Sequence, residues 1–574
     1  MAKVRGIDGP NPGRSFREPL MPFISWRRKS YEVLPALSVR RRELRQSLRT
    51  VTFAWMFGIV WMSCAWGGHI KSFAKMLGFN DLAFGIMAAI PWAASFGQII
   101  STVIIERTGL RKIQFMHVMT LSRLTLMLIP VVPLLLPVPS ASAVVAMLCL
   151  MAASHFLGAL GMPAWWSWMG DLIPRRIRGR YLAQRDRLTK LVQVFAVIML
   201  AILLDYVKVE GAAETVSLQG RLMRAICIVF LVGGVFGVVD VLLFSRVREV
   251  IRSVADSPRR PAIEIRVDRP KAGGALAMAS YAARYIAATV SQVLIDPLRD
   301  KAFRRFVLYG GSLIFAVSAG GWYWWLLAMD HLGFNFLATF VLYWAIPTLT
   351  GILCARMWGK LIDRWGRRPV LLTAAVGLTI SVLPWFVVTP EMPCPQFVPD
   401  SVNWLSRNVT GLFGEPADLL SPGAPVGAFL LILVNCSLGG VFWSGTWLGQ
   451  HAIKLGFSDG VGRSKYVAAA EVLISVGGIL GGLVGGIATE SLSRLQESPI
   501  GPFLWNNWHV AVAISLAARI FAAVMAARMP DPGSGSVREM FRLFGINTYR
   551  ALTPRWAYPL RLIRWRRRNN KHLR

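Results

Sequence analysis

Three carboxylates lie in or beside apolar stretches of the chain, where they could carry protons. Asp186 and Glu471 lie one helical turn inside two apolar runs, and Asp240 lies deep in a third. Moving an ionisable group into lipid costs several kcal/mol, so such a group faces a cavity or a partner. A buried carboxylate without a partner favours its protonated form and can take up and release a proton. Glu471 is therefore the first candidate for proton coupling, followed by Asp240 and Asp186. The alternative for each is a structural or gating ion pair.

A second set of side chains could contact a solute. The chain has 22 Trp, and a Trp presents a large apolar face and one N–H, which suits an aromatic, amphipathic or sugar-like ligand. Trp side chains at the headgroup level of a membrane are the alternative. Trp61, Trp443 and Asn435 lie deepest, and His155 lies in the middle of an apolar run. His155 could contact a substrate or relay protons, or be a packed histidine.

The elements that position these residues are membrane-spanning helices. Of the 574 residues, 54% are hydrophobic and 16% are charged, and the mean hydropathy is +0.48. The apolar residues come in runs of about 20, the length that crosses a bilayer as a helix. This composition excludes a disordered protein and a soluble multidomain enzyme. The sequence predicts an all-α polytopic membrane protein. Spans are expected at 51–73, 82–105, 113–136, 142–169, 183–205, 222–245, 306–328, 335–358, 369–389, 425–449, 466–490 and 508–528.

The basic residues orient these spans. Most of the 64 Lys and Arg fall in the segments that share one side if the N-terminus is cytoplasmic. We therefore expect a multi-pass protein of the cytoplasmic (inner) membrane with both termini in the cytoplasm. The charge contacts anionic lipid headgroups, and its spread over all these loops argues against nucleic-acid binding. The expected domains are a basic N-terminal segment, a six-helix bundle, a basic central loop with a possible amphipathic helix over 275–295, a second six-helix bundle and a basic tail, at 1–50, 51–245, 246–305, 306–530 and 531–574.

The two groups of six spans resemble each other. IERTGLRK (105–112) follows the second span, and IDRWGRRP (362–369) follows the eighth. Matching Tyr181 with Tyr466 places Asp186 opposite Glu471. The repeat is parallel, and transporters commonly bind their substrate at the midplane between such repeats. Span eleven contains GGILGGLVGG (477–486), in which glycines recur every four residues in two registers. Such glycines let helix backbones approach closely, as a packing surface or as a rocking surface.

GKLIDRWGRR (359–368) resembles the signature loop of the major facilitator superfamily, G-x-x-x-D-R-x-G-R-R/K. The matching residues are Gly359, Asp363, Arg364, Gly366, Arg367 and Arg368. The first-half copy is degraded, with Thr102 in place of the first glycine and Glu106 in place of the aspartate, and it retains Arg107, Gly109 and Arg111. The resemblance implies two pseudo-symmetric six-helix bundles. It also implies that Asp363 meets the cytoplasmic start of span five near Gly179 and Arg180, and that Glu106 meets the start of span eleven. Carboxylates are stabilised at helix N-termini. These contacts would latch the cytoplasmic end shut.

The resemblance further implies that spans one, four, seven and ten line a cavity, and that the protein is a secondary transporter working by alternating access. Its substrate would be a small molecule, with protons as a possible coupling ion, and we expect a monomer. One alternative is a non-transporting assembly factor or receptor on the same fold, which would lack a continuous polar cavity between the halves. The other is a lipid or lipid-linked sugar flippase, with a lateral opening and a hydrophobic track beside basic residues. The sequence contains no HExxH, GxSxG or GxxxxGK[ST] motif, so we expect no enzyme, cofactor or metal site.

Overall fold

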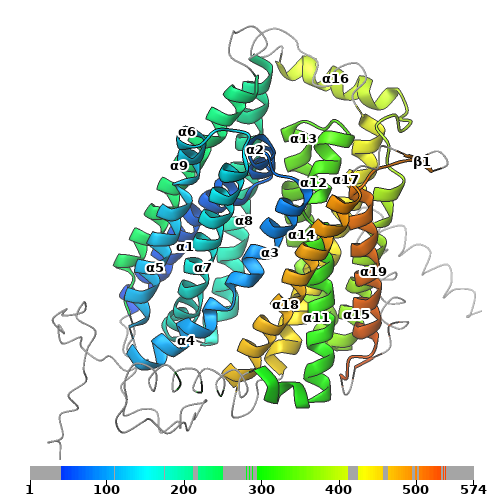
Figure 1. The fold of residues 1–574 in the computed structure, drawn as a ribbon. Helices are drawn as coiled ribbons and strands as arrows, with labels where there is room; N and C mark the ends of the chain where they lie inside the picture. The colour runs from blue at the N-terminus through cyan, green and yellow to red at the C-terminus, as the bar shows by residue number, and fades with distance from the viewer. Residues whose placement is uncertain are drawn as a thin grey trace, which may run out of the picture.

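The computed structural model describes residues 41–249 and 294–531, apart from residues 109, 174, 211–217, 411–424, 457–462, 494–497 and 501–502, with a few isolated positions beyond these ranges. Twelve helical segments within it are long and apolar enough to cross a membrane. The twelve predicted spans are therefore confirmed (Figure 1). The predicted amphipathic helix over 275–295 lies almost wholly outside the described residues, as do the first 40 residues and nearly all of the tail.

Several of the first six spans consist of two or three helical elements that follow one another closely. Their elements are α1 (Arg41–Trp66), α2 (His69–Leu77), α3 (Asp81–Ala94), α4 (Gly97–Thr108), α5 (Arg111–Leu126), η1 (Ile129–Val131), α6 (Val132–Leu135), α7 (Ala141–Leu172), α8 (Arg175–Glu210), α9 (Leu218–Leu243) and η3 (Phe244–Arg246).

The last six spans are built in the same way, with two π-helical turns and one added loop helix, α16. Their elements are η6 (Asp296–Arg299), α11 (Lys301–Gly320), α12 (Tyr323–Leu326), η7 (Leu327–His331), α13 (Phe336–Phe340), η8 (Val341–Ala345), α14 (Ile346–Trp365), α15 (Arg367–Ile380), η9 (Leu383–Phe386), α16 (Phe397–Thr410), α17 (Val426–Gly456), α18 (Arg463–Ser491), β1 (Ser498–Ile500), β2 (Phe503–Trp505) and α19 (Trp508–Ala527). β1 and β2 form an antiparallel hairpin.

Equivalent spans of the two halves begin with the same local chemistry. The side chain of Asn80 accepts a hydrogen bond from the N–H of Ala83 at 2.9 Å, which caps α3 of span two. Asn335 accepts from Ala338 at 2.8 Å and caps α13 of span eight. A polar cap satisfies one of the N–H groups that a helix start leaves unpaired. These asparagines fix where both spans begin.

We call the end of the bundle where α1 begins and α14 ends the basic end, and the opposite end, where α1 ends and α7 begins, the distal end. The distal end is uppermost in Figure 1, where α2 and α13 lie near each other. One buried cluster at the basic end belongs to the first six spans and includes Phe115, Trp168 and Phe244. Another belongs to the last six and includes Phe303 and Leu371. The distal cluster draws its residues from both halves.

Candidate functional site

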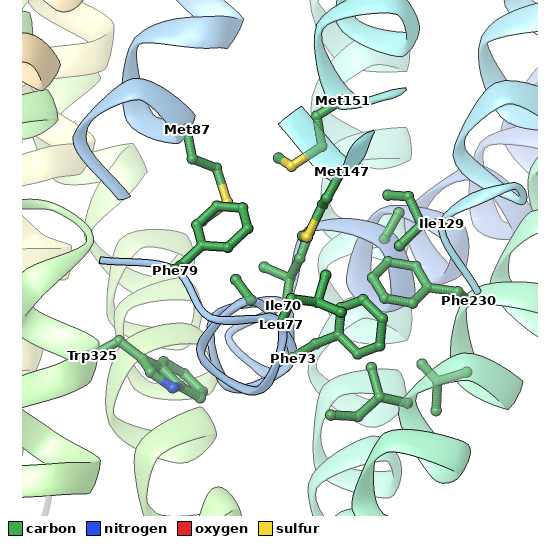
Figure 2. Close-up of a cluster of buried hydrophobic side chains, with 14 of the residues drawn as sticks. Ile70, Phe73, Leu77, Phe79, Met87, Ile129, Met147, Met151, Phe230 and Trp325 are labelled. Carbon is green, nitrogen blue, oxygen red and sulfur yellow. The ribbon is translucent and has the colours of Figure 1, made fainter. Parts of the chain in front are cut away.

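The short helix α2 closes the distal end between the two halves. Its Phe73 and Leu77 are fully buried and belong to the same core cluster as Trp325 of α12, across the two halves (Figure 2). Any side chain at Gly68 would overlap the Trp325 ring. The Lys71 ammonium lies 5.0 Å from the centroid of the same ring. The distal end is therefore sealed by a core that both halves share.

Asp205 joins the halves at the distal end through a helix start. It lies on α8 of span five and accepts hydrogen bonds from the backbone N–H groups of Phe336 at 2.9 Å and Leu337 at 2.7 Å, in the first turn of span eight. The first turn of a helix leaves its N–H groups unpaired and carries about half a positive charge. A carboxylate satisfies both requirements, so Asp205 tethers span eight of one half to span five of the other.

Glu490 makes the equivalent contact from the other half. Its carboxylate, at the distal end of α18, accepts the backbone N–H of Leu82 in the first turn of α3 at 3.3 Å. The spacing from Asp186 to Asp205 equals the spacing from Glu471 to Glu490, so the two carboxylates are equivalent positions of the repeat. The distal closure is thus a pair of latches related by the internal pseudo-symmetry. Sequence reasoning missed both, although their shared spacing was present in the chain.

Asp81 extends this closure into a network. Its carboxylate accepts from the Asn507 side-chain amide at 2.6 Å and from the Trp508 indole N–H at 3.1 Å. The Tyr323 hydroxyl donates to the Asp81 backbone carbonyl at 2.9 Å and accepts from the Thr489 hydroxyl, also at 2.9 Å. Hydrogen bonds to charged groups are stronger than neutral ones. Two elements of the last six spans, α12 and the start of α19, therefore bind Asp81 directly at the start of span two, and Thr489 of α18 supports them through Tyr323 and Asn507.

The glycines of α18 allow close packing against two neighbouring helices, α3 and α11. A Cβ atom on Gly482 would lie 2.7 Å from the carbonyl oxygen of Gly85 on α3, and one on Gly481 would overlap the carbonyl of Phe315 on α11. One register faces α3 across the halves, through Gly478, Gly482 and Gly486. The other packs against α11 within the same half, through Gly477, Gly481 and Gly485. Both registers are therefore packing surfaces, one between the halves and one within a half, and a rocking movement along the first stays a prediction.

At the basic end of the last six spans, the signature loop is bound to the end of span twelve. The carboxylate of Asp531 accepts the backbone N–H groups of Arg367 at 2.7 Å and Arg368 at 3.0 Å, at the start of α15. The Arg368 side chain donates to the Ala527 carbonyl at 2.7 Å, at the end of α19. Gly366 has a φ of +90°, and a Cβ there would lie 3.0 Å from the Asp531 carboxylate. The loop needs glycine here for both reasons.

The first half repeats this arrangement with different residues. Glu249, just after span six, accepts the backbone N–H of Lys112 at the start of α5 at 3.1 Å. The Lys112 ammonium donates to the carbonyls of Ser245 and Val247, both at 2.7 Å, where span six ends. In each half, an acid caps a helix start while a base caps a neighbouring helix end, as the helix dipole favours. These contacts bind spans three and six, and spans nine and twelve, without crossing between the halves.

Comparison with known proteins identifies this architecture. No family model and no curated protein matches the sequence. Among solved structures, the xylose transporter XylE from E. coli, in a partially occluded inward-open conformation, matches with a TM-score of 0.52 and 12% identity over 86% of this chain and 100% of that one. The nucleoside transporter NupG matches with a TM-score of 0.50 and 12% identity over 85% and 98%. The chain has the fold of these two transporters, the fold that its resemblance to the major facilitator superfamily implies. At this identity the likeness concerns the fold alone.

Within the major facilitator fold, Trp61 lies in the core of the first half. It is 5% exposed, and the Arg123 guanidinium lies 3.4 Å from its ring centroid. Arg123 in turn lies 3.8 Å from the carboxylate of Asp240, and both are buried. The Trp61 Nε1, the Arg123 Nε and the Asp240 Oδ1 are buried without a hydrogen-bond partner. The structure therefore places Trp61 in a buried cluster of charges whose polar atoms are incompletely satisfied, and its contact with a solute stays a prediction. The sequence separations hid the cluster, because spans one, three and six meet only in the fold.

The other predicted cavity residues have different surroundings. The His155 ring stacks against Trp66, with 4.1 Å between ring centroids, and its Nε2 is buried without a hydrogen-bond partner. Asn435 is buried on α17, whereas Trp443, two turns further along the same helix, is 41% exposed. A solute site at these three residues stays a prediction.

The two carboxylates predicted one turn inside spans five and eleven both form ion pairs. Glu471 pairs with Lys454 of α17 and its side chain is 46% exposed. Asp186 lies 3.1 Å from Lys190, one helical turn away on α8. The ion-pair alternative therefore holds for both residues, and the partner of Glu471 is Lys454 near the end of α17. Proton coupling by either carboxylate stays a prediction. Asp240 is left as the buried carboxylate of the three.

For the latch predicted at the basic end, the structure describes some of the residues and leaves out their expected partners. The Asp363 side chain is exposed, and a Cβ on Gly359 would meet open space. Arg111 donates to the Ser167 carbonyl of its own half at 3.3 Å. The side chains of Glu106, Arg107, Gly179 and Arg180, and the whole of Gly109, lie outside the described residues. A latch closes only when its end of the bundle is shut, so its role stays a prediction here. Among the described residues, no group of three His, Cys, Asp or Glu could hold a metal ion.

Proposed function

We propose that this chain is a secondary transporter that moves a small solute across the cytoplasmic membrane by alternating access. The two moving units would be the six-helix bundles at 51–245 and 306–530. The central site would lie between them, on the faces of spans one, four, seven and ten.

One relationship supports this proposal above the others. The described contacts between the halves include hydrogen bonds to helix starts, the Asp81 network, the ion pair of Lys75 and Asp330, the glycine seam and the α2 plug, and these lie toward the distal end. At the basic end, the caps of Asp531 and Glu249 lie within single halves. The distal contacts can therefore break while each half stays intact, as a rocking movement requires.

The distribution of basic residues assigns the basic end to the cytoplasm. On that assignment, the structure represents a state closed to the outside, the inward-facing side of a transport cycle. The Asp205 and Glu490 latches would stabilise this state. Asp363 and Glu106 would stabilise the opposite state, in which the cytoplasmic end is closed.

Asp240 is the residue that we propose for proton coupling. It is buried beside one base, Arg123, and one of its oxygens lacks a partner. Protonation of Asp240 would leave Arg123 without its ion-pair partner and so change the packing of spans one, three and six. An Asp240→Asn variant would abolish solute accumulation driven by a proton gradient and would retain exchange of solute across the membrane.

The decisive experiment links the halves at the distal end in proteoliposomes. Cysteines replacing Asp205 and Leu337 would form a disulfide that holds the distal end shut, and solute uptake should stop and return on reduction. Cysteines replacing Ser122 and Ser154, whose hydroxyls lie 3.2 Å apart within the first half, are the matched control and should leave uptake intact. Uptake that continues through the distal cross-link would contradict alternating access.

The solute can be found beforehand by melting the purified protein against sugars, nucleosides, amino acids, organic anions and amphipathic drugs. A ligand at 100 times its Kd stabilises the folded state by about 2.7 kcal/mol. A rise confined to one chemical class would name the substrate class. Binding of a partner protein with no such rise and no uptake would favour the assembly-factor alternative.

A further inference from the structure

A basic cavity opens at the basic end of the first half. It has a volume of about 680 Å³ and lies between the start of α1, the start of α8 and the end of span six. Four arginines line it, Arg45, Arg49, Arg185 and Arg246, and no carboxylate is among the described residues of its lining. Four guanidinium groups around one cavity repel one another unless an anion lies among them. The cavity therefore suits an anionic ligand.

Arg185 carries the charge furthest into the protein. Its guanidinium lies 5.6 Å from the Trp55 ring centroid and 5.4 Å from that of Trp165, and its Nε and Nη1 are buried without hydrogen-bond partners. The adjacent carboxylate, Asp186, is paired with Lys190 instead. Two buried guanidinium nitrogens without acceptors leave hydrogen-bonding capacity unsatisfied at the cavity wall.

The cavity wall is also apolar. Phe53, Met56 and Leu188 line it beside the arginines. Along α8, the positions one and two turns beyond Leu188 are Leu191, 51% exposed, and Phe195, 66% exposed, and residues three and four apart share one helix face. An exposed apolar stripe therefore leads from the cavity toward the bilayer midplane.

We propose that this cavity binds the headgroup of an anionic phospholipid, with one acyl chain on the α8 stripe. Basic pockets between membrane helices on the cytoplasmic side recognise anionic headgroups. The stripe explains why the ligand would be a lipid rather than free phosphate, because only a lipid has a chain to cover it. The site adds a lipid requirement to the proposed transporter and involves none of the residues assigned to the solute or the proton.

The test measures lipid binding by native mass spectrometry of the detergent-purified full chain, with phosphatidylglycerol and phosphatidylethanolamine of equal chain length. The wild type should retain one phosphatidylglycerol about tenfold more tightly than phosphatidylethanolamine. The R49Q/R246Q variant should lose that preference, and both arginines are exposed, so the change should leave folding intact. R299Q/R304Q removes the same charge from the start of the last six spans and should keep the preference. R185Q is a second test that removes the charge held between Trp55 and Trp165.

Three outcomes would overturn the proposal. An equal loss in both double variants would mean that the preference reflects net charge alone. Displacement of phosphatidylglycerol by inorganic phosphate or by glycerophosphoglycerol at matched concentration would show a free-phosphate site without a role for the acyl chain. Movement of labelled phosphatidylglycerol between leaflets of proteoliposomes, abolished by R49Q/R246Q, would show a transported lipid rather than a bound one. None of these readouts depends on solute uptake, so this proposal and the transport proposal can fail separately.

Discussion

Asp205 and Glu490 occupy equivalent positions of the internal repeat, and each carboxylate accepts a backbone N–H at the start of a helix in the opposite half. The resemblance to the major facilitator signature assigns the same device to Asp363 and Glu106 at the other end of the bundle. The interaction between a carboxylate and a helix N-terminus is strong when the two halves meet at that end of the bundle. When the halves part, both groups are solvated by water. One kind of contact could thus stabilise both states of the cycle.

Asp205→Asn is expected to loosen the distal closure. The amide keeps the shape of the side chain but accepts as a neutral group, and the difference is about 1 kcal/mol, or roughly fivefold in the open population. The measurement is the alkylation rate of Ala74→Cys on α2, with the native cysteines replaced by serine, because Ala74 is fully buried when the distal end is closed. The rate should rise about fivefold.

Asp186→Asn is the matched control, because its ion pair lies within α8 at the basic end, and it should leave the rate unchanged. Glu490→Gln should raise the rate less than Asp205→Asn, since it loses one contact of 3.3 Å rather than two shorter ones. An equal rate in Asp205→Asn and the parent would remove Asp205 from the latch.

Asp363→Asn should shift the same measurement in the opposite direction. If Asp363 holds the basic end shut in the alternate state, its loss favours the state seen here, and alkylation of Ala74→Cys becomes slower than in the parent. Lys360→Gln, which removes a charge from the same signature loop, serves as the control. Faster alkylation in Asp363→Asn would contradict the latch.

Adjacent glycines of α18 should give different defects. Gly482→Ala places a methyl group against the Gly85 carbonyl of the other half, whereas Gly481→Ala places one against the Phe315 carbonyl of its own half. Overpacking costs about 1–3 kcal/mol. Gly482→Ala should therefore speed alkylation of Ala74→Cys with little change in melting temperature, and Gly481→Ala should lower the melting temperature. Identical behaviour of the two variants would contradict the assignment of one register to contacts between the halves and the other to contacts within a half.

Removing one partner of the Arg123–Asp240 pair should lower the stability of the protein strongly, whereas replacing both by apolar residues should lower it little. Asp240→Asn leaves a buried guanidinium without its counter-charge, and removal of one partner of a buried pair typically costs about 3–5 kcal/mol. The double variant Arg123→Met and Asp240→Leu should recover most of the melting temperature, because an apolar pair of similar volume is often neutral. A double variant less stable than Asp240→Asn would mean that the cluster needs its charges to fold.

The sequence predicted the parts of this molecule that depend on local pattern. Span lengths, the two glycine registers and the repeat all follow from the order of residues along one helix or one half. The partners of Glu471 and Asp240 did not follow, because Lys454 lies on the preceding helix α17 and Arg123 lies three spans away from Asp240. Asp205 and Glu490 look like ordinary solvated helix ends in the sequence. Their role depends on which helix start of the other half lies opposite, and only the fold determines that.

The seam between Gly482 and Gly85 affects how well the surface exposed on opening is hydrated. Glycine is counted as apolar in hydropathy scales, but it leaves the peptide groups of its helix uncovered. When the seam parts, two facing strips of bare backbone come into contact with water. The wall exposed by opening would then owe much of its polarity to peptide groups, along a stretch that hydropathy predicts to be apolar.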